Sequence, residues 1–184
     1  MKRIFIFPTI EEAKAFILTQ PRDPVFVAGV GAAEIAAATI RAVKARKPQL
    51  VVLAGIAGAY DRTLRRGEVV EVVTERIAGI PARYAREYET TGPDLGLPLA
   101  AGVTVNRSGE GLRDGLSETP SDTLPEIENM EGAAFFAVCE ALGVACCQIR
   151  AVSNYVGEPF GRWAVGQAVE NLTATLTQIF GNDE

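Results

Sequence analysis

The sequence contains no histidine, and this absence removes several classes of chemistry. A catalytic Ser–His or Cys–His pair cannot form, and neither can a metal site with histidine ligands. Any catalysis must rest on carboxylates, amides, hydroxyls and arginine. We therefore expect no bound metal and no cofactor.

Positive charge is also scarce, because 18 Lys and Arg residues stand against 23 Asp and Glu. Proteins that bind phosphate backbones carry a basic stripe, and none is visible, so we expect no nucleic-acid partner. There is no signal peptide and no apolar run of about 18 residues that could span a bilayer. The sequence thus predicts a soluble, cytoplasmic protein with no membrane partner.

Only three cysteines are present, Cys139, Cys146 and Cys147, and all lie in strongly apolar segments. Free cysteine in such surroundings behaves as a small hydrophobic residue. The adjacent pair would point to opposite faces of a strand, which is a poor geometry for holding a metal. We interpret all three as core residues without a redox role.

What the sequence does have is enough apolar side chains for a core, since 48% of its 184 residues are hydrophobic. A chain of this length can bury a large part of its unfolded surface within one domain. No internal repeat is visible. We predict a single domain over residues 1–184.

Short apolar runs followed by small residues recur along the first sixty residues. The runs Lys2–Phe7, Pro24–Ala28 and Leu50–Ala54 predict strands, and helices are predicted over 11–18 and 33–43. This alternation is typical of an α/β fold with a mostly parallel sheet. Polar groups that follow such strands meet at one rim, where open α/β sheets bind ligands.

Further elements are predicted in the rest of the chain. Strands are expected over 67–74 and 99–105, and the alternating acids of the first indicate one exposed face. Apolar residues at three and four spacing predict a closing helix over 163–180. Residues 106–125 show no periodicity and predict a loop.

The glycines of Gly29–Gly31 allow a tight turn between a predicted strand and helix. Backbone amides at such a turn can bind an anion. A plain tight turn is the other reading, and both remain open.

The polar side chains expected at the rim include Glu12, Glu131, Arg150, Ser153 and Asn154. Carboxylates stabilise an oxocarbenium-like transition state and can activate water, so this set favours cleavage of a glycosidic bond. Structural readings remain open as well. Glu131 could satisfy a helix start or pair with Arg150, and Ser153 with Asn154 could cap a helix.

Three segments together resemble the nucleoside phosphorylase and nucleosidase superfamily, namely Ala54–Gly58 (AGIAG), Asn129–Ala134 (NMEGAA) and Ile149–Asn154 (IRAVSN). Within it, the similarity is to the hydrolases that act on futalosine, through Thr104–Asn106, Ser153–Val156 and the later Trp163. The resemblance covers almost the whole chain. It implies a three-layer α/β/α fold with a central, mostly parallel mixed sheet, and hydrolysis of a small-molecule nucleoside.

The resemblance also implies roles for individual residues. Glu12 would activate water, with Glu11 as the alternative if the register slips by one, and Arg150 would fix the water or Glu131. The expected substrate contacts are Met130 and Glu131 at the ribose, Ser153 and Asn154 at the purine, and Gly55, Thr104 and Asn106 elsewhere on the rim. The purine would be covered by one of Tyr88, Phe135, Phe160 and Trp163, of which Phe135 is better read as core.

Asn154 bears on the substrate, because related nucleosidases of methylthioadenosine and S-adenosylhomocysteine carry an aspartate there. An asparagine amide can donate to purine N7 or to a 6-oxo oxygen, which favours a 6-oxopurine such as that of futalosine. Adenine nucleosidase and purine nucleoside phosphorylase activities remain alternatives, as does a nucleoside-binding subunit without turnover. Phosphorylases of this superfamily bind phosphate through basic residues at the early glycine turns. Here Gly29–Ala33 has none and the first after Gly55 is Arg62, so the resemblance favours water over phosphate as the nucleophile. The resemblance further implies a homo-oligomer.

Overall fold

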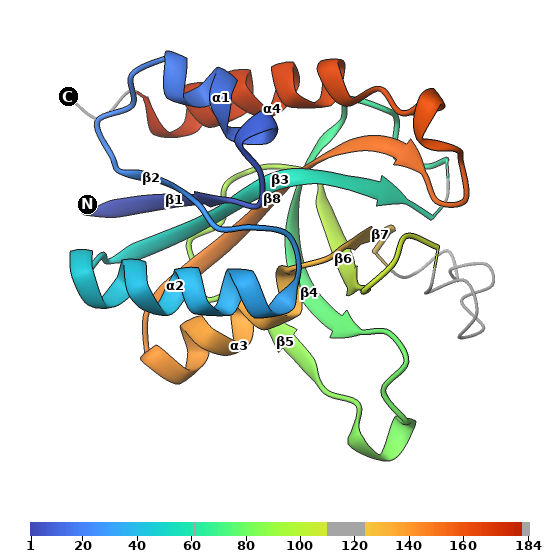
Figure 1. The fold of residues 1–184 in the computed structure, drawn as a ribbon, viewed down its shortest axis with the longest axis horizontal. Helices are drawn as coiled ribbons and strands as arrows, with labels where there is room; N and C mark the ends of the chain where they lie inside the picture. The colour runs from blue at the N-terminus through green and yellow to red at the C-terminus, as the bar shows by residue number, and fades with distance from the viewer. Residues whose placement is uncertain (61, 110–123, 182–184) are drawn as a thin grey trace.

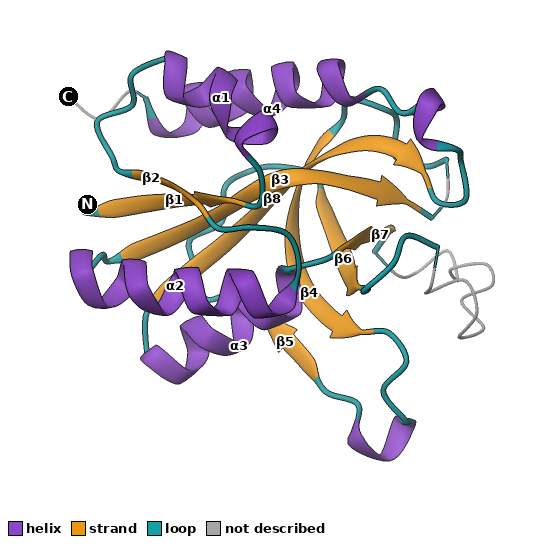
Figure 2. Cartoon of the chain, in the orientation of Figure 1, coloured by secondary structure: helices purple, strands orange, loops and turns teal. Residues whose placement is uncertain are grey.

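The computed structural model describes residues 1–60, 62–109 and 124–181. Eight strands form one sheet, with helices on both of its faces (Figures 1 and 2). In chain order the elements are β1 (Arg3–Phe7), α1 (Ile10–Leu18), β2 (Val25–Val27), α2 (Ala32–Arg46), β3 (Leu50–Ala59), β4 (Val69–Ile77), β5 (Glu87–Glu89), β6 (Leu99–Thr104), β7 (Glu126–Asn129), α3 (Gly132–Leu142), β8 (Ala145–Tyr155) and α4 (Val165–Phe180). The predicted α/β class is confirmed.

The sheet is mixed and mostly parallel, as predicted. Strand β1 pairs in parallel with β2 and β3, β3 with β8, and β6 with β4 and β7. The antiparallel pairs are β3 with β7, β4 with β5 and β4 with β8. Strand β3 pairs with both β7 and β8, and β4 pairs with both β6 and β8. These pairings join β3, β7, β6, β4 and β8 into a closed ring, so this part of the sheet curls on itself.

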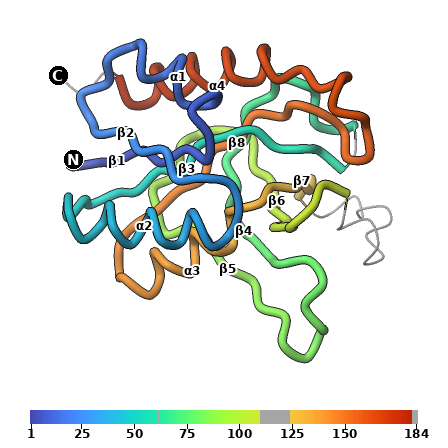
Figure 3. Tube along the Cα trace, in the orientation of Figure 1, coloured from blue at the N-terminus to red at the C-terminus, as the bar shows by residue number. Residues whose placement is uncertain are grey.

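Two apolar layers follow from the alternation of side chains along the central strands. Phe5 and Phe7 pack on one face of the sheet beneath α1 and α4, and Ile4 and Ile6 pack on the other against α2 and α3. Figure 3 shows the two helix pairs on opposite sides. Both faces of these strands are therefore buried, which explains why their sequences are apolar without interruption.

The cysteines occupy these same layers. Cys146 belongs to the layer under α2 and α3, and Cys147 to the layer under α1 and α4. All three thiols are free and buried. The prediction that the adjacent pair points to opposite faces is confirmed.

Strand β3 is longer than predicted, and this changes the position of its glycines. The strand was expected to end at Ala54, before a run of small residues, but it continues to Ala59. Gly55 and Gly58 therefore lie within the strand, where side chains of β8 approach closely. A Cβ on Gly55 would stand 2.6 Å from Arg150 Nη1, and one on Gly58 would stand 3.0 Å from Asn154 Nδ2. The small residues serve close packing and not a turn.

The prediction of an exposed acidic face on β4 is wrong. Glu71 is 2% exposed and Glu75 is fully buried, because the segment at Leu95 covers the first and the start of α3 at Gly132 covers the second. The Glu71 carboxylate accepts a hydrogen bond from Leu95 N at 3.1 Å. Alternation along a strand indicates two faces, but it does not tell which neighbours cover them.

Two short strands, β5 and β7, were not predicted. Each has only three or four residues, and their sequences EYE and EIEN show no apolar run. The loop predicted over 106–125 falls largely on residues 110–123, which lie outside the described residues.

We predict that Gly102→Ala lowers the free energy of unfolding by about 1–3 kcal/mol, the usual cost of overpacking a core. A Cβ on Gly102 in β6 would collide with the buried carboxylate of Glu75. Urea unfolding followed by circular dichroism measures the change. The matched control is Gly166→Ala in the first turn of α4, where a Cβ meets nothing within 4 Å. Equal stability of both variants would contradict the packing shown by the structure.

Candidate active site

A cavity of about 430 Å³ opens at the carboxyl ends of the central strands, and its volume suits a small molecule. Its walls come from the β1–α1 turn, the second half of β3, the end of β7 and the second half of β8. The apolar lining side chains are Pro8, Val30, Ile56, Ala57, Val105, Met130, Phe160, Trp163 and Val165. Its polar lining residues are Thr9, Glu11, Glu12, Ser108, Glu128, Asn129, Glu131, Arg150, Ser153 and Asn154.

Glu12 is held at the cavity by the cap of α1. Thr9 is the N-cap, and it forms a capping box with Glu12. Oε2 of Glu12 accepts from Thr9 N at 3.1 Å and from Thr9 Oγ1 at 2.6 Å, while Oε1 accepts from Ile56 N at 2.8 Å. A carboxylate oxygen can accept two hydrogen bonds, so Oε1 keeps one free position.

Burial raises the pKa of the Glu12 carboxyl, against the lowering effects of Thr9, Ile56 and Arg150. A carboxylate whose pKa is raised is a better proton acceptor than an ordinary one. Glu11 also borders the cavity but is exposed to solvent. The geometry therefore distinguishes two acids that the sequence left as alternatives.

Glu131 lies across the cavity, and its carboxylate is bound on both sides. Oε1 accepts from Gly31 N at 3.0 Å, and Oε2 accepts from Arg150 Nη2 at 3.1 Å. Gly29 and Gly31 have φ of +105° and +98°, which confirms a turn that requires glycine. An amide of this turn does bind an anion, but the anion is the carboxylate of Glu131.

Arg150 is almost fully buried at 1% exposure, and its guanidinium has three acceptors around it. Besides Glu131, it donates to Asn129 Oδ1 at 3.2 Å and to Ile56 O at 3.3 Å. Since Ile56 N also donates to Glu12 Oε1, the backbone of this one residue connects Glu12 with Arg150.

Asn129 was not singled out as a site residue, although it precedes the Met-Glu pair. Its Oδ1 accepts from Glu131 N at 3.0 Å and from Gly132 N at 2.7 Å. Thr104 Oγ1 accepts the next amide, that of Ala133, at 2.8 Å. The start of α3 is thus capped by Asn129 and Thr104, which leaves the side chain of Glu131 free for the cavity.

Ser153 and Asn154 are strand residues in β8, so the open reading of a helix cap does not hold. Ser153 Oγ donates to Asn154 Oδ1 at 2.7 Å, and Asn154 Nδ2 donates to the Tyr155 carbonyl at 3.1 Å. These bonds orient the amide, and the second hydrogen of Nδ2 remains available to a ligand.

Glu128 is a second residue that the sequence did not indicate. The sheet register places Gly58 beside Asn154 on one side and beside Glu128 on the other. A Cβ on Gly58 would stand 3.2 Å from Glu128 Cγ, so the absence of a side chain at Gly58 lets Glu128 and Asn154 approach closely from its two sides. Oε1 of Glu128 accepts from Ser108 Oγ at 2.5 Å and Oε2 from Gly109 N at 2.9 Å.

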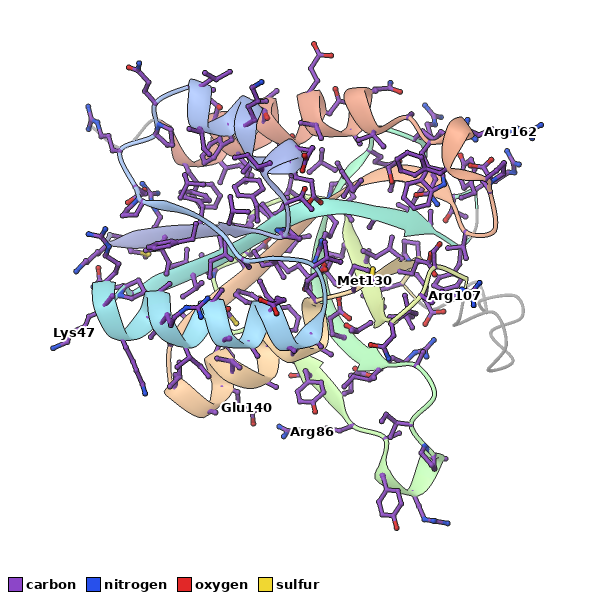
Figure 4. All side chains as sticks on the ribbon, viewed as in Figure 1. Lys47, Arg86, Arg107, Met130, Glu140 and Arg162 are labelled. Carbon is purple, nitrogen blue, oxygen red and sulfur yellow. The ribbon has the colours of Figure 1, made fainter. Side chains whose placement is uncertain are left out.

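Three residues predicted at the rim do not line the cavity. Gly55 lies behind it, against Glu12 and Arg150. Thr104 is buried, and its hydroxyl donates to Glu75 Oε2 at 2.8 Å. Asn106 is exposed and is absent from the cavity walls. By contrast, Met130 lines the cavity. Figure 4 labels it near the middle of the molecule.

The four aromatic candidates separate into two pairs. Phe160 and Trp163 line the cavity, and their ring centroids are 5.1 Å apart. Phe135 is fully buried, as expected of a core residue, and Tyr88 packs at the α2 and α3 layer. Trp163 Nε1 donates to Glu158 O at 3.1 Å, which fixes one edge of the indole.

Arg150 is the only cation among the described residues that line the cavity. Arg62, the first basic residue after the third strand, lies elsewhere, with its guanidinium 4.6 Å from the centre of the Tyr155 ring. Within residues 1–60, 62–109 and 124–181, no group of three Cys, Asp or Glu side chains is placed to hold a metal ion. In the same ranges no helix is long and apolar enough to cross a membrane.

Comparison with known proteins points to one family. Residues 3–98 and 123–181 match the family described as the phosphorylase superfamily. A futalosine hydrolase of Thermus thermophilus is 32% identical over 181 residues, which cover 80% of this chain and 77% of that protein.

Solved structures show the same fold. The 5′-methylthioadenosine/S-adenosylhomocysteine nucleosidase of Helicobacter pylori, crystallised with butyl-thio-DADMe-Immucillin-A, aligns with a TM-score of 0.80 at 17% identity over 97% of both chains. The futalosine hydrolase of Helicobacter pylori strain 26695 aligns with a TM-score of 0.79 at 16% identity, also over 97% of both. The two neighbours are similar to this chain to nearly the same degree.

We predict that stability falls as the pH rises from about 5 to about 8. Burial raises the pKa of Glu12 and Glu71, and that of Glu75 to about 7. Glutamate carboxyls of the unfolded chain titrate near 4.3. Between that pH and the raised pKa values, the folded chain therefore binds more protons than the unfolded chain, and unfolding releases them. The free energy of unfolding in urea, measured at both pH values, checks the sign. A flat or rising stability over this range would contradict it.

Proposed function

Because the chain belongs to the phosphorylase superfamily and is a nucleosidase, we propose that it hydrolyses the N-glycosidic bond of futalosine. The products are then hypoxanthine and dehypoxanthine futalosine. The 32% identity with a futalosine hydrolase supports this substrate. The observation that carries the proposal is the placement of Glu12 and Glu131 around one cavity with Arg150 as its only cation among the described lining residues.

The described lining has four glutamates against one cation, and such an excess of acids suits a reaction that develops positive charge. Cleavage of a glycosidic bond places that charge on the ribose ring, in an oxocarbenium-like transition state. In our proposal Glu131 accepts hydrogen bonds from the ribose hydroxyls, and Met130 packs beside the sugar. Arg150 keeps Glu131 in place through the 3.1 Å ion pair.

Glu12 is proposed to take a proton from the attacking water. The free acceptor position on Oε1 can bind a single water, while Thr9 and Ile56 hold the carboxylate still. The oxygen of the water forms the new bond to the sugar carbon as the bond to the purine nitrogen breaks. The purine leaves with the bonding electrons, and solvent protonates it, since an asparagine amide cannot act as a general acid.

Water is favoured over phosphate as the nucleophile by the charges around the cavity. A phosphate dianion needs cationic or amide donors that are free. The guanidinium of Arg150 already has three protein acceptors, and the amide of Gly31 is bonded to Glu131. A second anion beside Glu12 and Glu131 would also be repelled.

The base-binding end of the cavity supports a 6-oxopurine. Ser153 holds the Oδ1 of Asn154, which leaves an Nδ2 hydrogen to donate to N7 or to the 6-oxo oxygen. Across Gly58, the Glu128 carboxylate can accept from the N1–H that a 6-oxopurine carries and adenine lacks. Phe160 and Trp163 line the cavity, and in our proposal they cover the ring.

Base release from three nucleosides tests the proposal. The purified protein is incubated with futalosine, inosine and methylthioadenosine, with and without phosphate, and the free base is followed by chromatography. We expect hypoxanthine from futalosine at a rate that phosphate leaves unchanged. Acceleration by phosphate would indicate a phosphorylase, and adenine release from methylthioadenosine alone would indicate an adenine nucleosidase. No base from any substrate would indicate a binding protein without turnover.

We predict that Glu12→Gln lowers kcat by about 10²- to 10⁴-fold, the range typical of a lost general base. The amide keeps the size of the side chain, so the Kd for nucleoside should change little. Single-turnover base release and calorimetric binding measure the two effects. Glu11→Gln is the comparison, and a larger loss in that variant would assign the role to Glu11.

We predict that Asn154→Asp shifts preference from 6-oxopurine towards 6-aminopurine nucleosides by roughly tenfold or more in the ratio of kcat/KM values. A carboxyl replaces the amide donor and can accept from a 6-amino group. The control is the same change at Asn171 of α4, whose Nδ2 donates to the carbonyl of Gly67. An unchanged ratio would remove Asn154 from base recognition.

A further inference from the structure

Glu75 is a fully buried acid that takes no part in the chemistry described above. It lies in β4 behind the cavity wall and is not among the lining residues. Three side chains donate to its carboxylate, namely Asn129 Nδ2 at 2.5 Å, Thr104 Oγ1 at 2.8 Å and Gln148 Nε2 at 3.0 Å. These donors come from β7, β6 and β8, so Glu75 connects the strands that form the back of the site.

Asn129 transmits this arrangement to the cavity. Its Nδ2 faces the carboxylate of Glu75, and its Oδ1 faces the amides of Glu131 and Gly132 and the guanidinium of Arg150. A flipped amide would place two hydrogens against these donors and an oxygen against a carboxylate. The side chain therefore has one orientation, and Glu75 supplies the acceptor that selects it.

We propose that Glu75 is a positioning residue, which fixes the amide of Asn129 and through it the Glu131–Arg150 pair that binds the ribose. The assignment of the ligand rests on the proposed function. The positioning itself rests on the hydrogen bonds between Glu75, Asn129, Glu131 and Arg150.

The packing around Glu75 leaves its carboxylate no other position. Gly102 of β6 and Gly132 of α3 approach it so closely that a Cβ on either would collide with its oxygens. The helix start that carries Glu131 therefore contacts Glu75 directly. We expect a change in the Glu75 carboxylate to alter the position of the first residues of α3.

The acid lowers stability while it organises the site. Burial raises the pKa of Glu75 to about 7, although Asn129, Thr104, Arg150 and Gln148 all lower it. Arg150 is the one charged group among these causes; the others are neutral donors, and α3 contributes only Gly132 here. An ionised Glu75 therefore favours unfolding above neutral pH, and removing its charge should stabilise the fold. Neutralising Glu75 should therefore raise the stability of the fold but weaken the binding of the ligand.

A double-mutant cycle between Glu75 and Asn129 separates positioning from packing. Asn129→Asp keeps the acceptor for the α3 amides and Arg150, but it sets a carboxylate against that of Glu75. Glu75→Gln removes that repulsion, because its amide can donate to the new acid. Gln148 can adapt as well, since its Oε1 has no hydrogen-bond partner among the described residues and the side chain can flip.

The cycle is measured at pH 8 as kcat/KM and as the Kd for nucleoside. We expect Asn129→Asp to lower kcat/KM by roughly 10- to 100-fold and Glu75→Gln to lower it only a few-fold. The double variant should return to within a few-fold of Glu75→Gln, and the Kd for free hypoxanthine should stay constant throughout. Additive losses, or equal weakening of nucleoside and hypoxanthine binding, would overturn the inference.

The matched control is Glu71→Gln, which neutralises another buried acid of β4. Glu71 accepts from Leu95 N and has no bond to Asn129. Both Glu→Gln variants should be more stable than the wild type at pH 8, but only Glu75→Gln should rescue Asn129→Asp. Rescue by Glu71→Gln would reduce the effect to general charge removal and overturn the assignment.

The outcomes keep the inference apart from the proposed function. If the wild type binds inosine or methylthioadenosine but releases no base from futalosine, the proposed substrate fails and the cycle is read from nucleoside binding. If the wild type releases hypoxanthine and the cycle is additive, only the role of Glu75 fails. Binding of none of the three nucleosides would overturn both.

Discussion

The buried ion pair between Glu131 and Arg150 is the interaction on which the arrangement of the cavity depends. It joins the start of α3 to the middle of β8, and the Gly31 amide ties the same carboxylate to the turn before α2. Removing one partner would leave an uncompensated buried charge, which typically costs about 3–5 kcal/mol. Replacing both by apolar residues could preserve the fold, so the pair is better explained by the orientation it gives Glu131 than by net stability.

The charges near this pair do not balance. Glu12, Glu75 and Glu131 are buried close to a single buried cation, Arg150. The raised pKa values of Glu12 and Glu75 follow from their burial, and at Glu12 the nearby charge of Glu131 adds a smaller effect. A folded core gains nothing from such an arrangement at neutral pH. A reaction that develops positive charge on a sugar does gain from it, because the stabilising acids are already in place.

Local helix caps carry much of the site geometry. The capping box of α1 uses Glu12 as its third residue, so the same hydrogen bonds that begin the helix orient the proposed base. At α3 the cap is made by Asn129 and Thr104, and Glu131 points away from its own helix amides. The sequence left open that Glu131 merely satisfies a helix start, whereas in this protein its oxygens accept from Gly31 N and Arg150 Nη2 of other elements.

The sequence alone determined the α/β class, the order of the main strands and helices, and the motif residues at the rim. These follow from local signals: apolar runs of strand length, glycine turns, and polar side chains at strand ends. The sequence could not determine that Glu75 and Glu71 are buried, that Gly55 and Gly58 lie inside a strand, or that Glu128 faces Asn154 across Gly58. Those facts depend on which strands become neighbours when the sheet curls, and pairing between residues far apart in the chain leaves no local pattern. The tertiary structure also separates the environments of the two adjacent acids, because Glu12 is buried and accepts from Ile56 N whereas Glu11 is exposed.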